Sequence, residues 1–116
     1  MKNYLVIGNP IDHSLSPKLH NAWLKINNIN AFYDKQKLEE NEIENFIQNI
    51  RAQKIAGANI TVPFKKVVIP YLDKLSFEAE KTQSVNTIVF ENNNLVGHNT
   101  DVAGFTRAIF NLNFNI

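Results

Sequence analysis

Polar side chains that could bind a small polar ligand follow several apolar segments of the chain. They form three groups: Asp12, His13, Ser14 and Ser16; Asn59, Thr61 and Lys65; and Asn86, Thr87, Asn99 and Asp101. Together they offer the hydroxyl, amide, carboxylate and ammonium groups that hydrogen-bond to polar ligands. In a parallel α/β sheet, ligands bind beyond the carboxyl ends of the strands. The spacing therefore predicts that these side chains meet at one rim of a sheet.

Each of these residues also has a structural interpretation. Ser16 precedes Pro17 at a predicted helix start, where serine usually serves only as a cap. Ser14 could bond to nearby backbone, as loop serines often do. The polar groups of Asn59 and Thr61 lie in an apolar stretch and need partners, which backbone could equally supply. Spacing alone leaves both interpretations open for these residues.

Lys65 is less easily explained by structure alone. It falls in the first turn of a predicted helix, where the helix dipole disfavours a cation, so a counter-charge or a ligand should compensate it. Asp101 is a good N-cap for a later helix and gains chemical interest only if the fold brings it beside Lys65. For Lys65, the sequence favours a functional role and a structural role about equally.

The three histidines, His13, His20 and His98, lack the spacing of metal ligands, and no cysteine or pair of carboxylates accompanies them. No metal is expected. His98 is close to Asp101 in sequence and could act as a base, but a structural role at the surface is favoured.

Composition limits the class of protein. The chain has 116 residues, which predicts one domain over 1–116, and its net charge of +1 argues against nucleic-acid binding. No apolar run approaches the roughly 20 residues of a membrane span, and no signal peptide is evident, so a cytoplasmic protein without membrane contact is expected. The four glycines, Gly8, Gly57, Gly97 and Gly104, are too scattered for a dinucleotide-binding loop.

The elements that would position the polar groups alternate between strand and helix. Hydrophobic spacing and turn residues predict strands at 3–8, 31–34 and 56–61, and helices at 17–27, 40–52, 64–73 and 76–82. Segments 84–90 and 95–99 flank three asparagines and predict a hairpin. A final helix begins at Asp101 and ends without a polar cap, so the chain is expected to be cut. The predicted fold is a three-layer α/β sandwich with a mainly parallel sheet, one antiparallel strand from the hairpin, and helices on both faces.

Three sequence blocks in order resemble the signatures of shikimate dehydrogenases. The first runs from Gly8 to Pro17 (GNPIDHSLSP) and is followed by His20-Asn21, and the second runs from Gly57 to Lys65 (GANITVPFK). The third is Asn99-Thr100-Asp101 with Gly104-Phe105, and Val85-Asn86-Thr87 lies between the last two blocks. The resemblance covers essentially the whole chain.

The resemblance implies an enzyme that reversibly reduces 3-dehydroshikimate to shikimate with NADPH. It further implies that this chain is the N-terminal substrate-binding domain, because the family's Gly-rich NADP-binding Rossmann domain is absent from 1–116. Shikimate and 3-dehydroshikimate would be its ligands, NADP would bind the absent C-terminal domain, and the 116-residue fragment alone would be inactive. A homodimer of the protein is compatible with the resemblance.

The family pattern also implies roles for particular residues. Ser14 and Ser16 would bind the substrate carboxylate, and Thr61 would support that end of the ligand. Asn59, Asn86 and Asp101 would hold the ring hydroxyls. Lys65 would be the catalytic acid at the carbonyl oxygen, paired with Asp101.

Two departures weaken the transfer of substrate preference. Gln83-Ser84 replaces a small Gly-Ala pair, and Val102 stands where Gly is frequent. The alternative function is a free-standing, non-catalytic binding domain for shikimate-like or quinate-like polyhydroxylated carboxylates. A weaker alternative is a protein-interaction fragment whose last helix, with its phenylalanines, docks on a partner.

Overall fold

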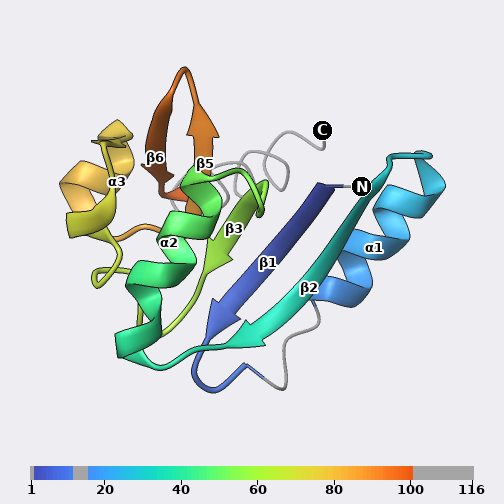
Figure 1. The fold of residues 1–116 in the computed structure, drawn as a ribbon, viewed down its shortest axis with the longest axis horizontal. Helices are drawn as coiled ribbons and strands as arrows, with labels where there is room; N and C mark the ends of the chain where they lie inside the picture. Colours follow the sequence, from blue (N-terminus) through green and yellow to red (C-terminus); the bar gives the residue numbers. More distant parts are fainter. Residues whose placement is uncertain (1, 12–15, 101–116) are drawn as a thin grey trace, which may run out of the picture.

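A computed structural model describes residues 2–11 and 16–100 of the chain (Figure 1). Its strands are β1 (Lys2–Gly8), β2 (Ala31–Lys37), β3 (Gly57–Ile60), β4 (Lys74–Leu75), β5 (Thr87–Glu91) and β6 (Asn94–His98). Its α-helices are α1 (Ser16–Ile26), α2 (Ile43–Arg51) and α3 (Phe77–Thr82), and two short 3-10 helices are η1 (Glu40–Glu42) and η2 (Ile69–Tyr71). The predicted alternation of strands and helices is confirmed.

The six described strands form one sheet in the order β2-β1-β3-β5-β6-β4. Strand β1 pairs in parallel with β2 and β3, and β4 pairs in parallel with β6. Strand β5 is antiparallel to both of its neighbours, β3 and β6. The predicted mainly parallel sheet with one antiparallel hairpin strand is therefore confirmed.

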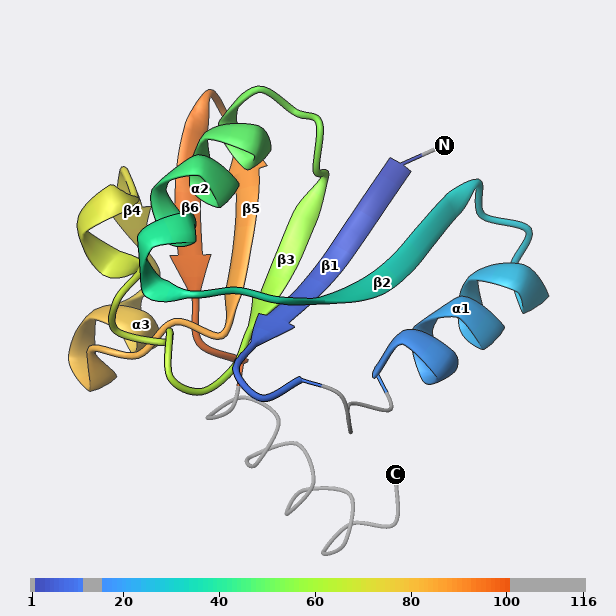
Figure 2. The ribbon, with the colours of Figure 1, turned by 60° about the horizontal axis from the view of Figure 1, so that its bottom comes forward.

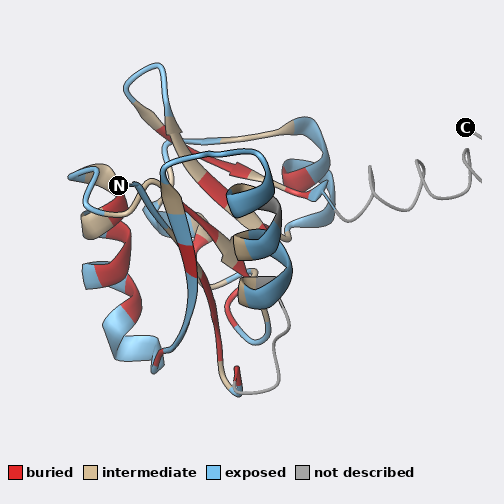
Figure 3. Cartoon of the chain, turned by 90° about the vertical axis from the view of Figure 1, so that its right-hand side faces the viewer, coloured by how far each residue is buried: buried red, intermediate tan, exposed pale blue. Residues whose placement is uncertain are grey.

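Two hydrophobic clusters cover opposite faces of the sheet. Consecutive residues of β1 alternate between them, with Ile7 in the larger cluster and Val6 in the smaller one. The larger cluster includes α2 and the buried Ala79 of α3, whereas Leu24 of α1 packs against the smaller cluster. Figure 3 shows the contrast, because α2 carries several buried residues (red), whereas the residues of α1 whose burial is described are half-buried or exposed. Helices thus lie on both faces.

Local sequence explains where α2 and α3 form. Four apolar residues of α2 at helical spacing, Ile43, Phe46, Ile47 and Ile50, are all buried. Helix α3 begins after Ser76, whose side-chain oxygen accepts a hydrogen bond from the N–H of Ala79 at 3.2 Å. The hairpin turn at Asn92-Asn93 has positive φ at both residues, as a two-residue type I′ turn requires.

The predicted α-helix at 64–73 is wrong. Residues 65–68 form turns and continue into the 3-10 helix η2. Pro70 explains the difference, because it has no N–H and its ring would collide with the carbonyl of the preceding turn of an α-helix. The next residues, Lys74–Leu75, form the short strand β4, which the sequence did not predict. The final helix predicted from Asp101 lies outside the described residues.

Asp73 joins the segment after η2 to two other parts of the fold. Its Oδ2 lies 2.9 Å from Nη1 of Arg51 at the end of α2 and accepts a hydrogen bond from the N–H of Leu95 at 2.8 Å. The Leu95 N–H, followed by the Arg51 guanidinium, holds the pKa of Asp73 below its ordinary value. Asp73 thus connects α2 and β6 to the segment that leads into β4.

Candidate functional site

The candidate residues that the structure describes gather where β1 and β3 end. In Figure 2 the carboxyl ends of both strands lie on the same side of the molecule as the beginning of α1. After η2, β4 and α3, the chain returns to the start of β5, where Asn86 lies beside β3. The Asn86 carbonyl accepts a hydrogen bond from the N–H of Ile60 at 2.7 Å. The predicted meeting of Asn59, Thr61 and Asn86 at one rim of the sheet is thus observed.

Asn59 is half-buried in β3, and its side-chain amide makes three hydrogen bonds. Its Nδ2 donates to Thr87 Oγ1 at 3.2 Å and to the carbonyl of Asn86 at 3.4 Å. Its Oδ1 accepts from the hydroxyl of Tyr33 at 2.5 Å. The amide is therefore held in one orientation, with its oxygen toward β2 and its nitrogen toward β5.

Asn86 is buried and uses its side-chain oxygen fully. Oδ1 accepts hydrogen bonds from Thr87 Oγ1 at 3.1 Å, from the N–H of Thr100 at 3.0 Å and from Thr100 Oγ1 at 3.2 Å. Because an amide oxygen has two lone pairs, these donors leave it no capacity for a ligand. Any contact between Asn86 and a ligand must come from its amide nitrogen, which can only donate.

Thr61 follows β3 directly and is locked onto β1. Its hydroxyl and its N–H both donate to the carbonyl of Ile7, at 2.6 Å and 3.0 Å. Gly8 makes this approach possible, since a Cβ at that position would overlap Thr61 Oγ1. The hydroxyl proton of Thr61 is thus engaged by backbone, and its oxygen can only accept from a ligand.

Lys65 is half-buried in the turns that follow β3, and its carbonyl accepts a hydrogen bond from the N–H of Val85 at 2.9 Å. This bond fixes the Lys65 backbone next to the segment that carries Asn86. Lys65 does not begin an α-helix, so the unfavourable helix dipole expected from the sequence does not act on its charge. Lys65 is a site candidate because its backbone lies next to the segment that carries Asn86.

Four candidate residues, Asp12, His13, Ser14 and Asp101, lie outside the described residues. Ser16 is described only as the first residue of α1, without its side chain. The predicted Lys65–Asp101 pair and the predicted carboxylate contacts therefore stay predictions.

Tyr33 contacts Asn59, and neither the residue spacing nor the resemblance marks Tyr33 in the sequence. Thr100, which the resemblance includes, donates two hydrogen bonds to Asn86 Oδ1. The pairing of Tyr33 with Asn59 depends on which strands are neighbours, which the sequence pattern does not specify. The resemblance did include His20-Asn21, and the structure explains both. Asn21 hydrogen-bonds to the backbone of Tyr33, and His20 stacks on its ring.

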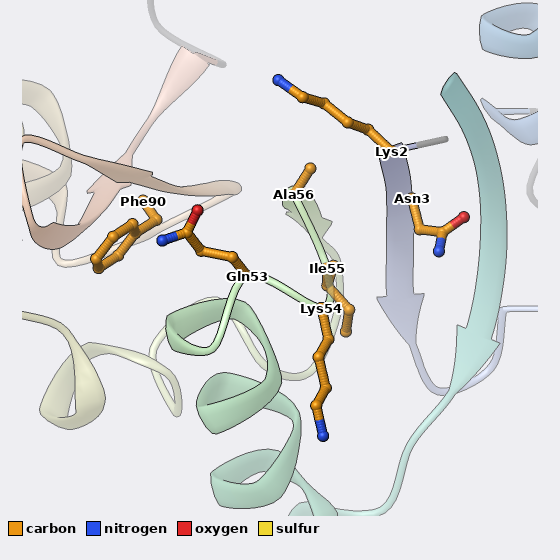
Figure 4. A pocket seen from close by; sticks show the side chains of 7 residues that line it. All are labelled: Lys2, Asn3, Gln53, Lys54, Ile55, Ala56 and Phe90. Atoms are coloured by element: carbon orange, nitrogen blue, oxygen red, sulfur yellow. The ribbon is translucent and has the colours of Figure 1, made fainter. Parts of the chain in front are cut away.

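A hollow of about 220 Å³ lies at the opposite end of β1 and β3, between Phe90, Gln53 and the start of β1. Figure 4 shows that the side chains of Lys2 and Lys54 point in opposite directions there, so their ammonium groups do not converge on one anion. This hollow contains none of the predicted site residues.

In the part of the chain that the structure describes, no three His, Cys, Asp or Glu side chains come together as metal ligands do. Nor does any helix in residues 2–11 and 16–100 have the length and apolar character to cross a membrane. His98, considered as a base from sequence, lies 3.2 Å from Glu91 Oε1 on the hairpin.

Comparison with known proteins agrees with this geometry. The profile of the shikimate dehydrogenase substrate binding domain matches residues 6–88. Shikimate dehydrogenase (NADP(+)) of Pelagibacter ubique (strain HTCC1062) is 60% identical over 108 residues, which are 93% of this chain and 41% of that protein. The corresponding protein of Bacillus subtilis (strain 168) is 44% identical over 108 residues, covering 93% of this chain and 39% of that one.

The fold gives the same result. The crystal structure of shikimate 5-dehydrogenase from Listeria monocytogenes in complex with shikimate and NAD matches with a TM-score of 0.92 and 34% identity, covering 97% of this chain and 39% of that one. The chain thus spans about two fifths of the length of these relatives. The family predicted from the sequence is confirmed: the chain belongs to the shikimate dehydrogenase substrate-binding domains.

Proposed function

We propose that this chain is the substrate-binding domain of an NADP-dependent shikimate dehydrogenase, which reversibly reduces 3-dehydroshikimate to shikimate. The observation that carries the proposal is the cluster of Asn59, Thr61 and Asn86 at the carboxyl end of the sheet, with Lys65 in the adjoining turns. The names of the relatives and the shikimate bound to the Listeria enzyme support it.

The ligand's two kinds of polar group suit different parts of this rim. Ser14 and Ser16 are the proposed donors to its carboxylate, since hydroxyl groups form charge-assisted hydrogen bonds to anions. Thr61 supports that end by tying the segment after β3 to β1. Asn59 and Asn86, with Asp101, hold the ring hydroxyls, which both donate and accept hydrogen bonds.

Lys65 is the proposed catalytic acid. The ketone oxygen of 3-dehydroshikimate gains a proton on reduction, and the Lys65 ammonium can stabilise the developing negative charge on that oxygen and donate the proton. Asp101 is proposed to pair with Lys65 and hold it in position. In the reverse direction the same lysine, as the neutral amine, takes the proton from the hydroxyl of shikimate.

NADP does not fit the residues described here. Phosphate-binding loops need glycines whose missing side chains leave room for the ligand. The glycines in the described residues instead face protein atoms: Gly8 faces Thr61, Gly57 faces Ile88 and Tyr4, and Gly97 faces Leu72 and Val85. We therefore assign NADP to a C-terminal domain outside residues 1–116. A cytoplasmic location and a homodimer also stay predictions.

Binding of shikimate to the 116-residue chain tests the ligand assignment. Titration followed by ¹H–¹⁵N NMR should shift the side-chain amide signals of Asn59 and Asn86, and quinate should bind more weakly. Lys65→Ala should perturb the shikimate-induced shifts, while Lys66→Ala, at the exposed neighbouring lysine, should leave them unchanged. Shifts confined to the hollow around Gln53 and Phe90 would contradict the proposed site.

Catalysis is tested in an enzyme that carries this domain together with a cofactor domain. Lys65→Ala should lower kcat by on the order of 10²–10⁴ and change KM much less, because its charge is needed mainly in the transition state. Lys66→Ala is again the matched control. The isolated chain should show no NADP-dependent oxidation of shikimate. If the two-domain protein binds shikimate but never turns it over, a non-catalytic binding domain becomes the better assignment.

A further inference from the structure

Tyr33 is buried in β2 and is held in place by two residues of α1. The Nδ2 of Asn21 donates to the Tyr33 carbonyl at 2.6 Å, and the N–H of Tyr33 donates to Asn21 Oδ1 at 2.8 Å. The ring of His20 stacks on the Tyr33 ring, with 4.3 Å between centroids and 15° between planes. Both the backbone and the ring of Tyr33 are therefore fixed.

From this position the phenol reaches across β1 to β3. Tyr4 of β1 stands opposite Tyr33 on one side and Gly57 on the other, and Asn59 follows two residues after Gly57. The Tyr33 hydroxyl lies 2.5 Å from Asn59 Oδ1. Tyr33 and Asn59 line a hollow of about 120 Å³ on this face of the sheet, together with Tyr4 and Thr87.

The surrounding acceptors determine which way the Asn59 amide points. The carbonyl of Asn86 can only accept, so the nitrogen of the Asn59 amide must face it. The proton of Thr87 goes to Asn86 Oδ1, so Thr87 Oγ1 is also an acceptor toward Asn59 Nδ2. The Asn59 oxygen must then face Tyr33, whose hydroxyl is the donor.

We propose that Tyr33 is a positioning residue for the ligand site: its hydroxyl holds the amide oxygen of Asn59 so that the second lone pair of that oxygen accepts a ring hydroxyl of shikimate. The proposal rests on the proposed function. Both protons of Asn59 Nδ2 are directed at protein acceptors, so the oxygen is the atom with capacity for a ligand. Without the phenol, this oxygen loses its donor, and the amide is held only through its nitrogen, by the Asn86 carbonyl and Thr87 Oγ1.

Tyr33→Phe removes only the hydroxyl and keeps the ring that stacks on His20. In the 116-residue chain it should weaken shikimate binding by about three- to tenfold, as expected for the loss of one organising hydrogen bond. The matched control is Tyr4→Phe, which removes the hydroxyl of another tyrosine that lines the same hollow and should leave the Kd unchanged. A double-mutant cycle with Asn59→Ala should show that Tyr33→Phe has no further effect once Asn59 is absent.

A second readout does not depend on shikimate. In the unliganded chain, Tyr33→Phe should move the side-chain amide signals of Asn59 in the ¹H–¹⁵N spectrum and speed their exchange with water, whereas Tyr4→Phe should not. Failure of the wild-type chain to bind shikimate would refute the proposed function, yet the amide signals would still test whether Tyr33 positions Asn59. Unchanged amide signals in Tyr33→Phe, or an equal loss of affinity with and without Asn59, would overturn the inference.

Discussion

Replacing Gly8 by alanine tests whether the end of β1 must lack a side chain. A Cβ at this position would overlap Thr61 Oγ1 and lie 3.2 Å from both the Val62 carbonyl and Ile11 Cδ1. To relieve the overlap, Thr61 must rotate away and lose its 2.6 Å hydrogen bond to the Ile7 carbonyl. The lost bond costs about 1 kcal/mol and the overpacking about 1–3 kcal/mol, so Gly8→Ala should lower the free energy of unfolding by about 2–4 kcal/mol.

The measurement is urea or thermal unfolding of the 116-residue chain. At roughly 3–4 °C per kcal/mol for a domain of this size, the Tm should fall by about 6–16 °C. Gly57→Ala is a suitable control, because the nearest atoms to its Cβ are 3.3 Å and 3.4 Å away, and it should cost less than about 1 kcal/mol.

The background of Thr61→Ala isolates the cause. That substitution removes the hydroxyl with which the new Cβ would collide, so Gly8→Ala should then cost less than about 1 kcal/mol, and the two changes should be strongly non-additive. If Gly8→Ala is equally destabilising with threonine and with alanine at position 61, the collision with Thr61 is not the reason for the glycine.

Two further predictions concern stability away from the site. Asp73→Asn should lower the Tm at pH 7, and the difference from wild type should disappear as the pH falls well below 3.8, because a carboxyl whose folded pKa is lowered stabilises only above that range. A Tm difference that persists in acid would contradict this. Gln83→Gly should raise the free energy of unfolding by about 0.5–1 kcal/mol in urea unfolding, because Gln83 ends α3 with a φ of 52° that glycine adopts without strain. An unchanged or lower value would show that the hydrogen bond from Gln83 Nε2 to the Glu80 carbonyl outweighs the strain.

The sequence predicted those features that depend on local pattern. Spacing and turn residues predicted the buried strands before Gly8 and around Ala58. They also predicted the amphipathic helix with Phe46 and the hairpin around Asn92. The prediction of an α-helix around Pro70 was wrong, because apolar spacing indicates a helix there while the proline prevents one.

The site could be predicted only in part, for a different reason. Asn59 and Asn86 are polar residues at strand ends, so topology alone brings them to the rim. Tyr33 reaches Asn59 across an intervening strand, and that contact depends on the order of β2, β1 and β3 and on their register. No local pattern encodes such a contact.

The hydrogen bonds between Asn21 and Tyr33 also bear on how this domain can associate. Strand β2 is at the edge of the sheet, and an edge strand with unpaired N–H groups invites another chain to add to it. Here three outward N–H groups are already engaged: that of Ala31 by the Ile29 carbonyl, that of Tyr33 by Asn21, and that of Lys35 by Asp34 Oδ1. A strand added alongside β2 would have to displace these hydrogen bonds, which disfavours a sheet continued from one copy of this domain into another.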